Sequence, residues 1–395
     1  MTRPFEGIKI IDITHVLAGP FAAYQLAVLG ADVIKVENPE DCDQSRNTGY
    51  DAELNRTNMG TGYLTQGSNK RSITLNLKTE KGREILKSLV KDADVLVENF
   101  RPGAFRELGI GYDDMKKINP TLIYCSMTAF GQDGPRGTQT AYDHAIQALS
   151  GIMAITGTPE VSPLKTGTQV IDYATGTMGA FAISTALFQR EKTGKGQYID
   201  SSMLDVALMM LASNITGYLQ TGKHPGPTGN HHHYASNSLY DTKDGKVMLA
   251  ASNKGQHTRL FRALGHPEMG DKDYQYRAEN REPEAEMLRG VMAQRTAQEW
   301  EDFLQGSHVP AGRIRTMGEA LEDPQLATRN ILHQHATVPG VGDNVTVPMC
   351  AFKLAHGGPS IETPPPQLGE HNDEILGELG YAAKDIAALR DEGVI

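Results

Sequence analysis

A strand, a tight turn, a helix and a second strand follow one another at the start of the chain, and this pattern restricts the fold more than any other. The β-branched run 8–13 predicts the first strand, and the run 31–37 predicts the second. The turn Val16–Pro20 and an apolar helix over 21–29 connect them. A strand, crossover helix and strand form a βαβ unit, whose two strands pair in parallel. The chain therefore starts as an α/β protein with a parallel sheet.

The same alternation continues beyond this unit. Strand patterns cover 70–77, 93–100 and 121–127, and helical patterns cover 79–91 and 104–108. They predict an α/β sheet covered by helices on both faces. The polar segment 39–69 is predicted to be a loop, and the Met- and Leu-rich helix within 197–215 is predicted to belong to the core.

Ligands of such sheets bind outside the carboxyl ends of the strands. Val16, Asn99, Phe130 and Asp172 are expected to gather there. The first turn carries only Gly19 and lacks the GxGxxG pattern, so a dinucleotide cofactor is disfavoured. Nucleophile elbows, Walker loops and HExxH zinc motifs are also missing from the sequence.

The composition changes beyond Gly217. Segment 221–230 is rich in glycine and proline, which marks a linker or a lid. A strand pattern at 246–251 and a helix at 296–305 indicate a separate, smaller domain. Neighbouring residues do not share a helix face, so His231–His233 predict a loop with one useful histidine rather than a metal site.

Charge and cysteine content exclude several classes of function. The formal net charge of −10 over 395 residues argues against non-specific nucleic-acid binding and against anionic membranes. No apolar run is long enough to span a bilayer. The three cysteines lack ligand spacing, which is typical of reduced thiols in a cytoplasmic protein without a metal site.

The stretch 166–194 carries the candidate catalytic residue. Small and apolar residues recur at helical spacing after Asp172, and Gly194 predicts the end of the helix. Asp172 then lies at or just before the helix N-terminus, where Asp is a frequent capping residue. The functional alternative is a carboxylate nucleophile, with Gly176 and Gly179 leaving room for a substrate.

Several motifs decide between these alternatives by their resemblance to a known family. They are HVLAGPFAAYQLAVLGADVIKVENP from His15, NKRSITLNLK from Asn69, VENFRPGAFRELGIGY from Val97, AFGQDGP from Ala129, VIDYATG from Val170, TGKGQYIDSSMLD from Thr193 and LGEHNDEIL from Leu368. Together they resemble the class III coenzyme A transferases, the family of formyl-CoA transferase and carnitine CoA-transferase, over essentially the whole chain.

The resemblance implies a large Rossmann-like domain over 1–220 that 330–395 complete, a small domain with linkers over 221–329, and an interlocked homodimer. It also implies that Asp172 attacks the donor acyl-CoA to form a mixed anhydride. The released thiolate then forms an aspartyl-CoA thioester, from which the acceptor acid leaves as its own CoA ester through a second anhydride. No ATP, metal or tightly bound cofactor is needed, because the exchange is nearly isoenergetic.

The remaining site residues are also implied by the resemblance. Contacts to coenzyme A are expected from Val16, Leu75, Lys78, Asn99, Phe100, Ala104, Arg106 and Tyr142. Lys78 and Arg106 suit the phosphates. Contacts to the acyl group or acceptor are expected from His15, Leu17, Asp143 and His232. Backbone N–H groups near Gly176 or in the 130s loop are candidate oxyanion donors, and 225–234 is the candidate lid.

The chain departs from formyl-CoA:oxalate enzymes at three places. Leu17 replaces a glutamine, Asn38 replaces an arginine, and 229–234 replaces a run of glycines. These changes favour a larger acyl group or a dicarboxylate such as succinate or mesaconate over formate and oxalate.

Two other functions remain as alternatives. An α-methylacyl-CoA racemase has the same fold and pairs the aspartate with a histidine. The histidine position falls at Tyr142, a poor base at neutral pH, and His144 is expected on another helix face. The second alternative is a CoA-binding subunit without catalysis, which the glycine-flanked Asp172 disfavours.

Overall fold

The computed structural model describes residues 2–395, which form two compact units. One unit comprises the chain up to 152 together with 165–222 and 325–395, and the other comprises 153–164 and 223–324. None of the helices in the described part of the chain is long and apolar enough to cross a membrane.

The first unit is built on a six-stranded sheet in the order β3-β2-β1-β4-β5-β6, in which every neighbouring pair is parallel. The strands are β1 (Lys9–Ile13), β2 (Asp32–Glu37), β3 (Lys70–Thr74), β4 (Val95–Glu98), β5 (Ile123–Thr128) and β6 (Gln197–Ser202). The predicted parallel α/β sheet is therefore confirmed. The strand order reverses between β1 and β4, which is where such sheets leave a crevice for ligands.

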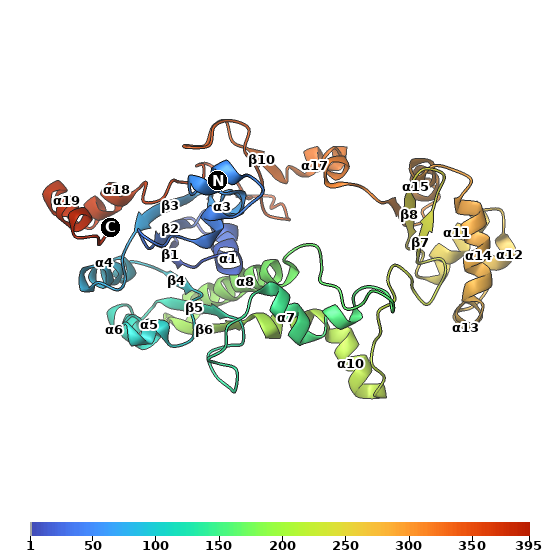
Figure 1. The fold of residues 1–395 in the computed structure, drawn as a ribbon, viewed down its shortest axis with the longest axis horizontal. Coiled ribbons are helices and arrows are strands. Elements are labelled where there is room, and N and C mark those ends of the chain that lie inside the picture. Colours follow the sequence, from blue (N-terminus) through green and yellow to red (C-terminus); the bar gives the residue numbers. More distant parts are fainter. Residues whose placement is uncertain (1) are drawn as a thin grey trace. The chain divides into compact units, whose positions relative to one another are not determined.

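Helices cover both faces of this sheet (Figure 1). One face carries α1 (Ala18–Ala27) and α8 (Val170–Thr193), which pack on alternate residues of β1, β4 and β5 such as Ile10, Val95 and Ile123. The opposite face carries α4 (Glu80–Lys91), α5 (Ala104–Glu107) and α6 (Tyr112–Ile118). Successive strand side chains point to opposite faces, so each central strand contributes to both cores.

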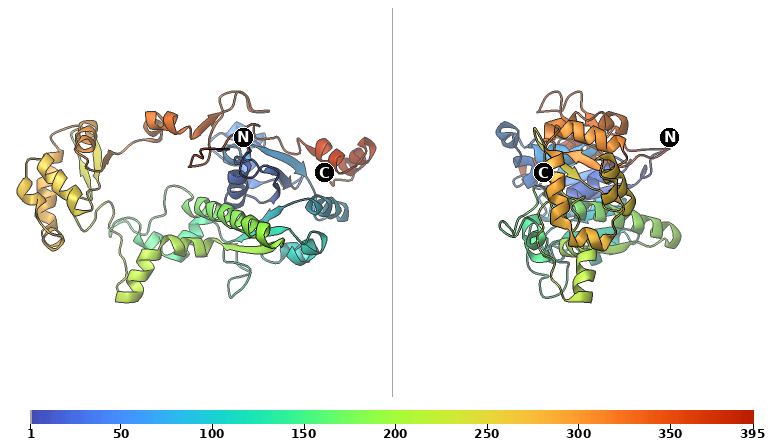
Figure 2. Two further views of the ribbon diagram at one scale, coloured as in Figure 1. Left: turned by 180° about the vertical axis from the view of Figure 1, so that it is seen from behind. Right: turned by 90° about the vertical axis from the view of Figure 1, so that its right-hand side faces the viewer.

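The C-terminal helices complete the same unit. They are α18 (Asn372–Glu378) and α19 (Ala383–Asp391). Gly380 lies between them with a φ of 89°, a left-handed conformation that ends a helix. In Figures 1 and 2 (red), α18 lies beside the edge strand β3, and α19 packs on α18.

The prediction of a loop over 39–69 is wrong. This segment contains the 3₁₀ helix η1 (Gln44–Asn47) and the helices α2 (Ala52–Arg56) and α3 (Thr61–Gly67). Met59, Tyr63 and Leu64 are buried against Val338 of the C-terminal segment. Helices of this length are too short to show a clear apolar period in a sequence.

The other helices of this unit follow β5 and β6. They are α7 (Asp143–Ser150), α9 (Met203–Met210) and α10 (Ala212–Thr221). The prediction that the Met- and Leu-rich stripe lies in the core is only half right. Met203 and Val206 are buried, whereas Met209 and Met210 are exposed.

The second unit is a small α+β unit. Its antiparallel sheet has the order β7 (Leu239–Asp241), β8 (Lys246–Leu249) and β9 (Ala311–Arg313). Its helical segments are η2 (Met153–Ile155), α11 (Lys254–Ala263), α12 (Pro267–Gly270), α13 (Tyr274–Glu279), α14 (Arg281–Met292), α15 (Ala297–Gly306) and α16 (Met317–Leu321). Phe261, Leu288 and Trp300 lie in its core. The chain then continues through α17 (Pro324–Arg329), β10 (Leu332–Gln334) and β11 (Thr346–Pro348).

Candidate active site

A cavity of about 850 Å³ opens at the carboxyl ends of β1, β4 and β5. His15 to Ala18 line it after β1, Asn99 to Pro102 after β4, and Met127 to Ala129 at the end of β5. Residues 139–142 and Asp172 close it from the other side. Its volume is in the range of small-molecule sites. It lies at the carboxyl ends of the strands, as the sequence predicts, but Ala129 rather than Phe130 reaches it.

The turn after β1 is clamped to the end of β4 by one side chain. Asn99 Oδ1 accepts the N–H of His15 at 2.9 Å, and Asn99 Nδ2 donates to the carbonyl oxygen of His15 at 2.8 Å. The ring of Phe100 meets the ring of His15 edge-on, with centroids 5.0 Å apart. Burial lowers the pKa of His15, which keeps its imidazole neutral at pH 7.

Val16 has a φ of 72°, which is costly for a β-branched residue. Two further side chains hold it there. Asp43 Oδ1 accepts the N–H of Val16 at 2.8 Å, and Gln66 Nε2 donates to its carbonyl oxygen at 2.7 Å. Hydrogen bonds with the surrounding side chains therefore hold the turn in its strained conformation, which is typical of a functional site.

A buried ionic network supports this turn from below. Lys35 pairs with Asp43 and Lys70 pairs with Asp12, each at 2.9 Å and fully buried. Lys35 Nζ also donates to the carbonyl oxygen of Thr14 at 2.6 Å. Burial opposes the charge on Asp12, but Lys35 and Lys70 outweigh it and lower its pKa to about 2. Asp12 and Lys35 therefore stay charged near neutral pH, and Lys35 holds the backbone by a charge-assisted hydrogen bond. Burial lowers the pKa of Lys70.

Asp172 is the third residue of α8, and its own side chain does not cap the helix. The cap is Asp143, whose Oδ2 accepts the N–H groups of Ile171 at 2.7 Å and Asp172 at 3.1 Å. The interpretation of Asp172 as a simple capping residue is therefore wrong. Its carboxylate makes no hydrogen bond or ion pair to any residue of 2–395 and lines the cavity. Burial raises the pKa of Asp172 to about 7, and the nearby charge of Asp143 adds to the shift.

Asp143 is fixed in turn by Gln147. Gln147 Nε2 donates to Asp143 Oδ1 at 2.5 Å and to Thr166 Oγ1 at 3.0 Å, and Gln147 Oε1 accepts the N–H of Thr166. Both carboxylate oxygens of Asp143 thus accept hydrogen bonds from the protein itself. The resemblance, by contrast, implies that Asp143 contacts the substrate. In this structure Asp143 positions the first turn of α8.

The glycines of α8 serve helix packing rather than substrate approach. A Cβ on Gly176 would lie 2.6 Å from the carbonyl oxygen of Ala18, and one on Gly179 would lie 2.7 Å from Met127. Both positions allow α1 and the end of β5 to contact α8 closely. The prediction that they leave room for a substrate is wrong.

The candidate oxyanion donors are also already bonded. Gly176 lies inside the helix, where its N–H bonds the preceding turn. In the 130s loop, the N–H of Gly131 bonds Thr128 Oγ1 at 3.0 Å and that of Gln132 bonds Asp200 at 2.9 Å. The N–H groups of Leu17 and Ala18, which line the cavity at the start of α1, make no hydrogen bond within the described residues.

A narrower slot of about 180 Å³ adjoins the cavity, and the two share His15, Asp41 and Phe100. Leu75, Ala104 and Leu108 form its apolar walls, and the exposed Lys78 lies at its rim. Four residues of the predicted CoA set, Leu75, Lys78, Phe100 and Ala104, are therefore together in one place. Val16, Asn99 and Tyr142 line the main cavity.

Comparison with known proteins identifies the family. Residues 5–372 match the model of CoA-transferase family III. The chain belongs to this family. It is 36% identical to the succinate–glutarate CoA-transferase of Agrobacterium fabrum, over 95% of this chain and 96% of that one. It is 37% identical to the human succinyl-CoA:glutarate CoA-transferase, over 100% of this chain and 90% of that one. A CAIB/BAIF family protein from Brucella suis has the same fold, with a TM-score of 0.83 and 34% identity over 96% of this chain and all of that one.

Two residues of the predicted set lie elsewhere in the transferase. Arg106 is on the opposite side of α5 from the slot and lines another cavity. His232 belongs to the second unit, where Arg281 Nε donates to its carbonyl oxygen at 2.9 Å and its N–H donates to Ser238. The rest of the candidate lid, 225–234, lies in that unit as well.

His144 and Gln147 are site residues that the sequence did not reveal. His144 lines the same cavity as Tyr142 and Asp172, so the expectation that it faces elsewhere is wrong. The angle that a helix would set between residues 142 and 144 does not apply, because α7 begins at Asp143 and Tyr142 has an extended backbone. Gln147 lies one turn after Asp143 on α7, a spacing of four residues that is a usable signal for a supporting side chain. No group of three metal-ligating side chains is present within residues 2–395.

Proposed function

We propose that this transferase moves coenzyme A from an acyl-CoA thioester to a free dicarboxylic acid, with Asp172 as the covalent carrier. The observation that supports it is the free, buried carboxylate of Asp172 inside a cavity bounded by the turn of β1 and the end of β4. A carboxylate nucleophile conserves the activation of the acyl group as an anhydride or a thioester.

The reaction balances without a cofactor. An oxygen of ionised Asp172 adds to the thioester carbonyl of the donor, the C–S bond breaks, and CoA leaves as a thiolate. The thiolate then attacks the carbonyl carbon of Asp172, the C–O bond of the anhydride breaks, and the donor acid leaves as a carboxylate. The acceptor carboxylate repeats these two steps in reverse order, which returns Asp172 to its ionised form.

The described residues suggest how each step is helped. The cap by Asp143 fixes the backbone of Asp172, so that its carboxylate points into the cavity. The unbonded N–H groups of Leu17 and Ala18 are our candidates for holding the developing oxyanion, since they lie at the positive end of α1. The slot with Lys78 suits the adenine and phosphates of CoA.

Dicarboxylate acceptors are proposed because both relatives named above act on glutarate. The test is a panel of succinyl-CoA, acetyl-CoA and formyl-CoA against glutarate, succinate, mesaconate, oxalate and monocarboxylic acids, with products identified by mass spectrometry. Conversion of at least one dicarboxylate to its CoA ester is expected. Transfer to monocarboxylic acids alone contradicts the proposed substrate class.

The racemase remains worth testing because His144 shares the cavity with Asp172. Incubation with a 2-methylacyl-CoA in heavy water, without an acceptor acid, distinguishes the two reactions. The transferase is expected to leave the α-hydrogen in place. Uptake of α-deuterium favours the racemase.

A homodimer is proposed from the apolar surface of α8 to α10. Phe181 and Phe188 are each 64% exposed, and Met209 and Leu219 are exposed at 51% and 73%. Large apolar side chains gathered on neighbouring helices usually mark an interface. Light scattering of the purified chain is expected to give twice the mass of 43.0 kDa, and a monomer contradicts this proposal.

A further inference from the structure

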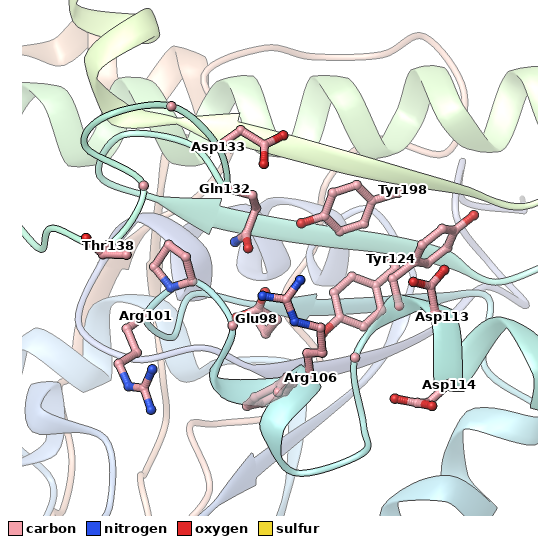
Figure 3. A pocket seen from close by; sticks show the side chains of 17 residues that line it. Glu98, Arg101, Arg106, Asp113, Asp114, Tyr124, Gln132, Asp133, Thr138 and Tyr198 are labelled. Carbon is pink, nitrogen blue, oxygen red and sulfur yellow. The ribbon is translucent and has the colours of Figure 1, made fainter.

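A second large cavity, of about 540 Å³, lies on the other side of α5 from the CoA slot. It shares Arg101 and Pro102 with the cavity of Asp172 but does not include Asp172. Its walls come from the loop after β4, from α5 and α6, and from the loop after β5, as Figure 3 shows. The volume is sufficient for a small-molecule ligand.

Three tyrosines form the apolar part of this cavity. Tyr124 and Tyr198 are paired across β5 and β6, and their ring centroids lie 5.7 Å apart. Tyr112 of α6 packs on both, at 5.9 Å from Tyr124 and 5.2 Å from Tyr198. The face of a tyrosine ring can pack against an aliphatic stem and can attract a cation.

Glu98 is a buried acid without a cationic partner. It ends β4 with 5% exposure, and its Oε2 accepts the N–H of Phe100 at 2.9 Å. Burial raises the pKa of Glu98 to about 7, although hydrogen bonds from Ser126 and Phe100 act in the opposite direction. None of the groups that shift this pKa is a cation. A cation that enters the cavity would pair with this carboxyl group and favour its ionised form.

Arg106 is the opposite case, a cation without an anionic partner. Its guanidinium makes no hydrogen bond or ion pair with the described residues, and Figure 3 shows it extending into the cavity above Glu98. Arg101 differs, because it pairs with Glu107 at 2.5 Å. A free guanidinium is suited to bind a carboxylate through two parallel hydrogen bonds.

The rim adds further negative charge through Asp113, Asp114 and Asp133. These carboxylates disfavour a purely anionic ligand such as the phosphates of CoA. A simple cation would leave Arg106 unmatched. A ligand that carries one carboxylate and two cationic groups matches both sets of charges.

We propose that this cavity binds a free amino acid with a cationic side chain, a function beyond the transfer reaction. Its carboxylate binds Arg106, its two cationic groups face Glu98 and the aspartates of the rim, and its aliphatic stem lies on Tyr124 and Tyr198. No covalent step is involved.

The test is calorimetric titration of the full-length protein with L-arginine and L-lysine, and with two analogues of arginine. Agmatine lacks the carboxylate and N-acetyl-L-arginine lacks the α-ammonium group, so each is expected to bind at least tenfold more weakly than L-arginine. Arg106→Met and Glu98→Gln are each expected to weaken L-arginine by about tenfold or more. Arg56→Met, an exposed arginine of α2, is the matched control and leaves the affinity unchanged.

Asp113→Asn provides a second variant at an exposed position, in case the buried Glu98→Gln variant folds poorly, and a loss of about threefold or more is expected. The proposal is overturned if neither amino acid gives a saturable signal up to about 20 mM, which corresponds to binding too weak to be specific. It is also overturned if agmatine binds as well as L-arginine. Competition by CoA overturns it too, since this would place the cavity within the CoA site.

Discussion

The turn after β1 and the first turn of α8 border the same cavity, but the chain holds them in opposite ways. At His15 and Val16 the backbone N–H groups donate to Asn99 and Asp43, and the carbonyl oxygen of Val16 accepts from Gln66. At Asp172 only the backbone is fixed, and the carboxylate has no partner among residues 2–395. A binding surface must not move, whereas a nucleophile must keep its lone pairs free. The comparison predicts that changes in the turn act on stability and binding, while changes at Asp172 act on chemistry.

The largest expected effect comes from Asp172→Asn. Because the amide cannot attack a thioester, kcat is expected to fall by about 10⁴-fold or more. The folded pKa of about 7 lies above the ordinary value, so the ionised carboxylate destabilises the fold progressively as pH rises through this range. The variant is therefore expected to be more stable than the parent at pH 8, by about 1–4 kcal/mol.

Steady-state kinetics and urea unfolding check both parts. Asp41→Asn, which removes the other carboxylate of the cavity lining, is the matched control and keeps kcat within about tenfold. A large loss of stability in Asp172→Asn contradicts the view that this side chain has no structural role.

The second effect concerns the turn. Asp43→Asn leaves the buried Lys35 without a full counter-charge and weakens the bond to the N–H of Val16. Breaking one partner of a buried pair costs about 3–5 kcal/mol. The midpoint of urea unfolding is expected to fall accordingly, whereas Glu392→Gln, in the exposed pair with Lys81, has little effect. Equal stability of the two variants contradicts the role given to the buried network.

The third effect is a pH dependence of the chemical step. Only ionised Asp172 is a nucleophile, and its pKa is raised to about 7 by burial and then by Asp143. The activity kcat/KM is expected to fall about tenfold per pH unit below 7 and to level off above it.

Asp143→Asn sharpens this prediction, since it removes a charge that raises the pKa of Asp172. The acid limb of the pH profile is expected to move to lower pH, while kcat on the plateau falls because the helix cap is weakened. An unchanged acid limb shows that the limb belongs to another group.

The smallest effect is expected at the CoA slot. Lys78→Met removes a cation at its rim, and the KM for the acyl-CoA donor is expected to rise about tenfold, or 1.4 kcal/mol, with kcat unchanged. Lys81→Met on the exposed face of α4 is the control. A fall in kcat without a change in KM contradicts the assignment of Lys78 to coenzyme A.

The sequence predicted the elements that have a clear period or a clear end. The β-branched runs became the strands of the sheet, and Gly194 ends α8 in a left-handed conformation with a φ of 67°. The prediction for segment 39–69 failed because η1, α2 and α3 are each too short to show a periodic pattern of apolar residues. The charges that fix this segment, such as Glu37 with Arg46 at 2.7 Å, pair residues with no local signature.

The site was predicted in its residues more than in its contacts. The strand pattern placed Val16, Asn99 and Asp172 at the carboxyl ends of the sheet, and the resemblance added Tyr142; all four line one cavity, whereas Phe130 does not. Neither revealed that Asn99 bonds the backbone of His15, because such a contact depends on the register of β1 and β4. The residue pattern of α8 wrongly assigned its glycines to substrate approach, since a small residue in a sequence does not show which neighbour approaches it.

The most direct test of the account is a search for the acyl or CoA adduct on Asp172. The protein is mixed with succinyl-CoA, treated with hydroxylamine, digested and analysed by mass spectrometry. We predict a hydroxamate on the peptide that contains Asp172, formed only when the thioester has been added and absent from Asp172→Asn. Normal turnover without any modified Asp172, or a hydroxamate on another carboxylate, contradicts the assignment of this residue as the covalent carrier.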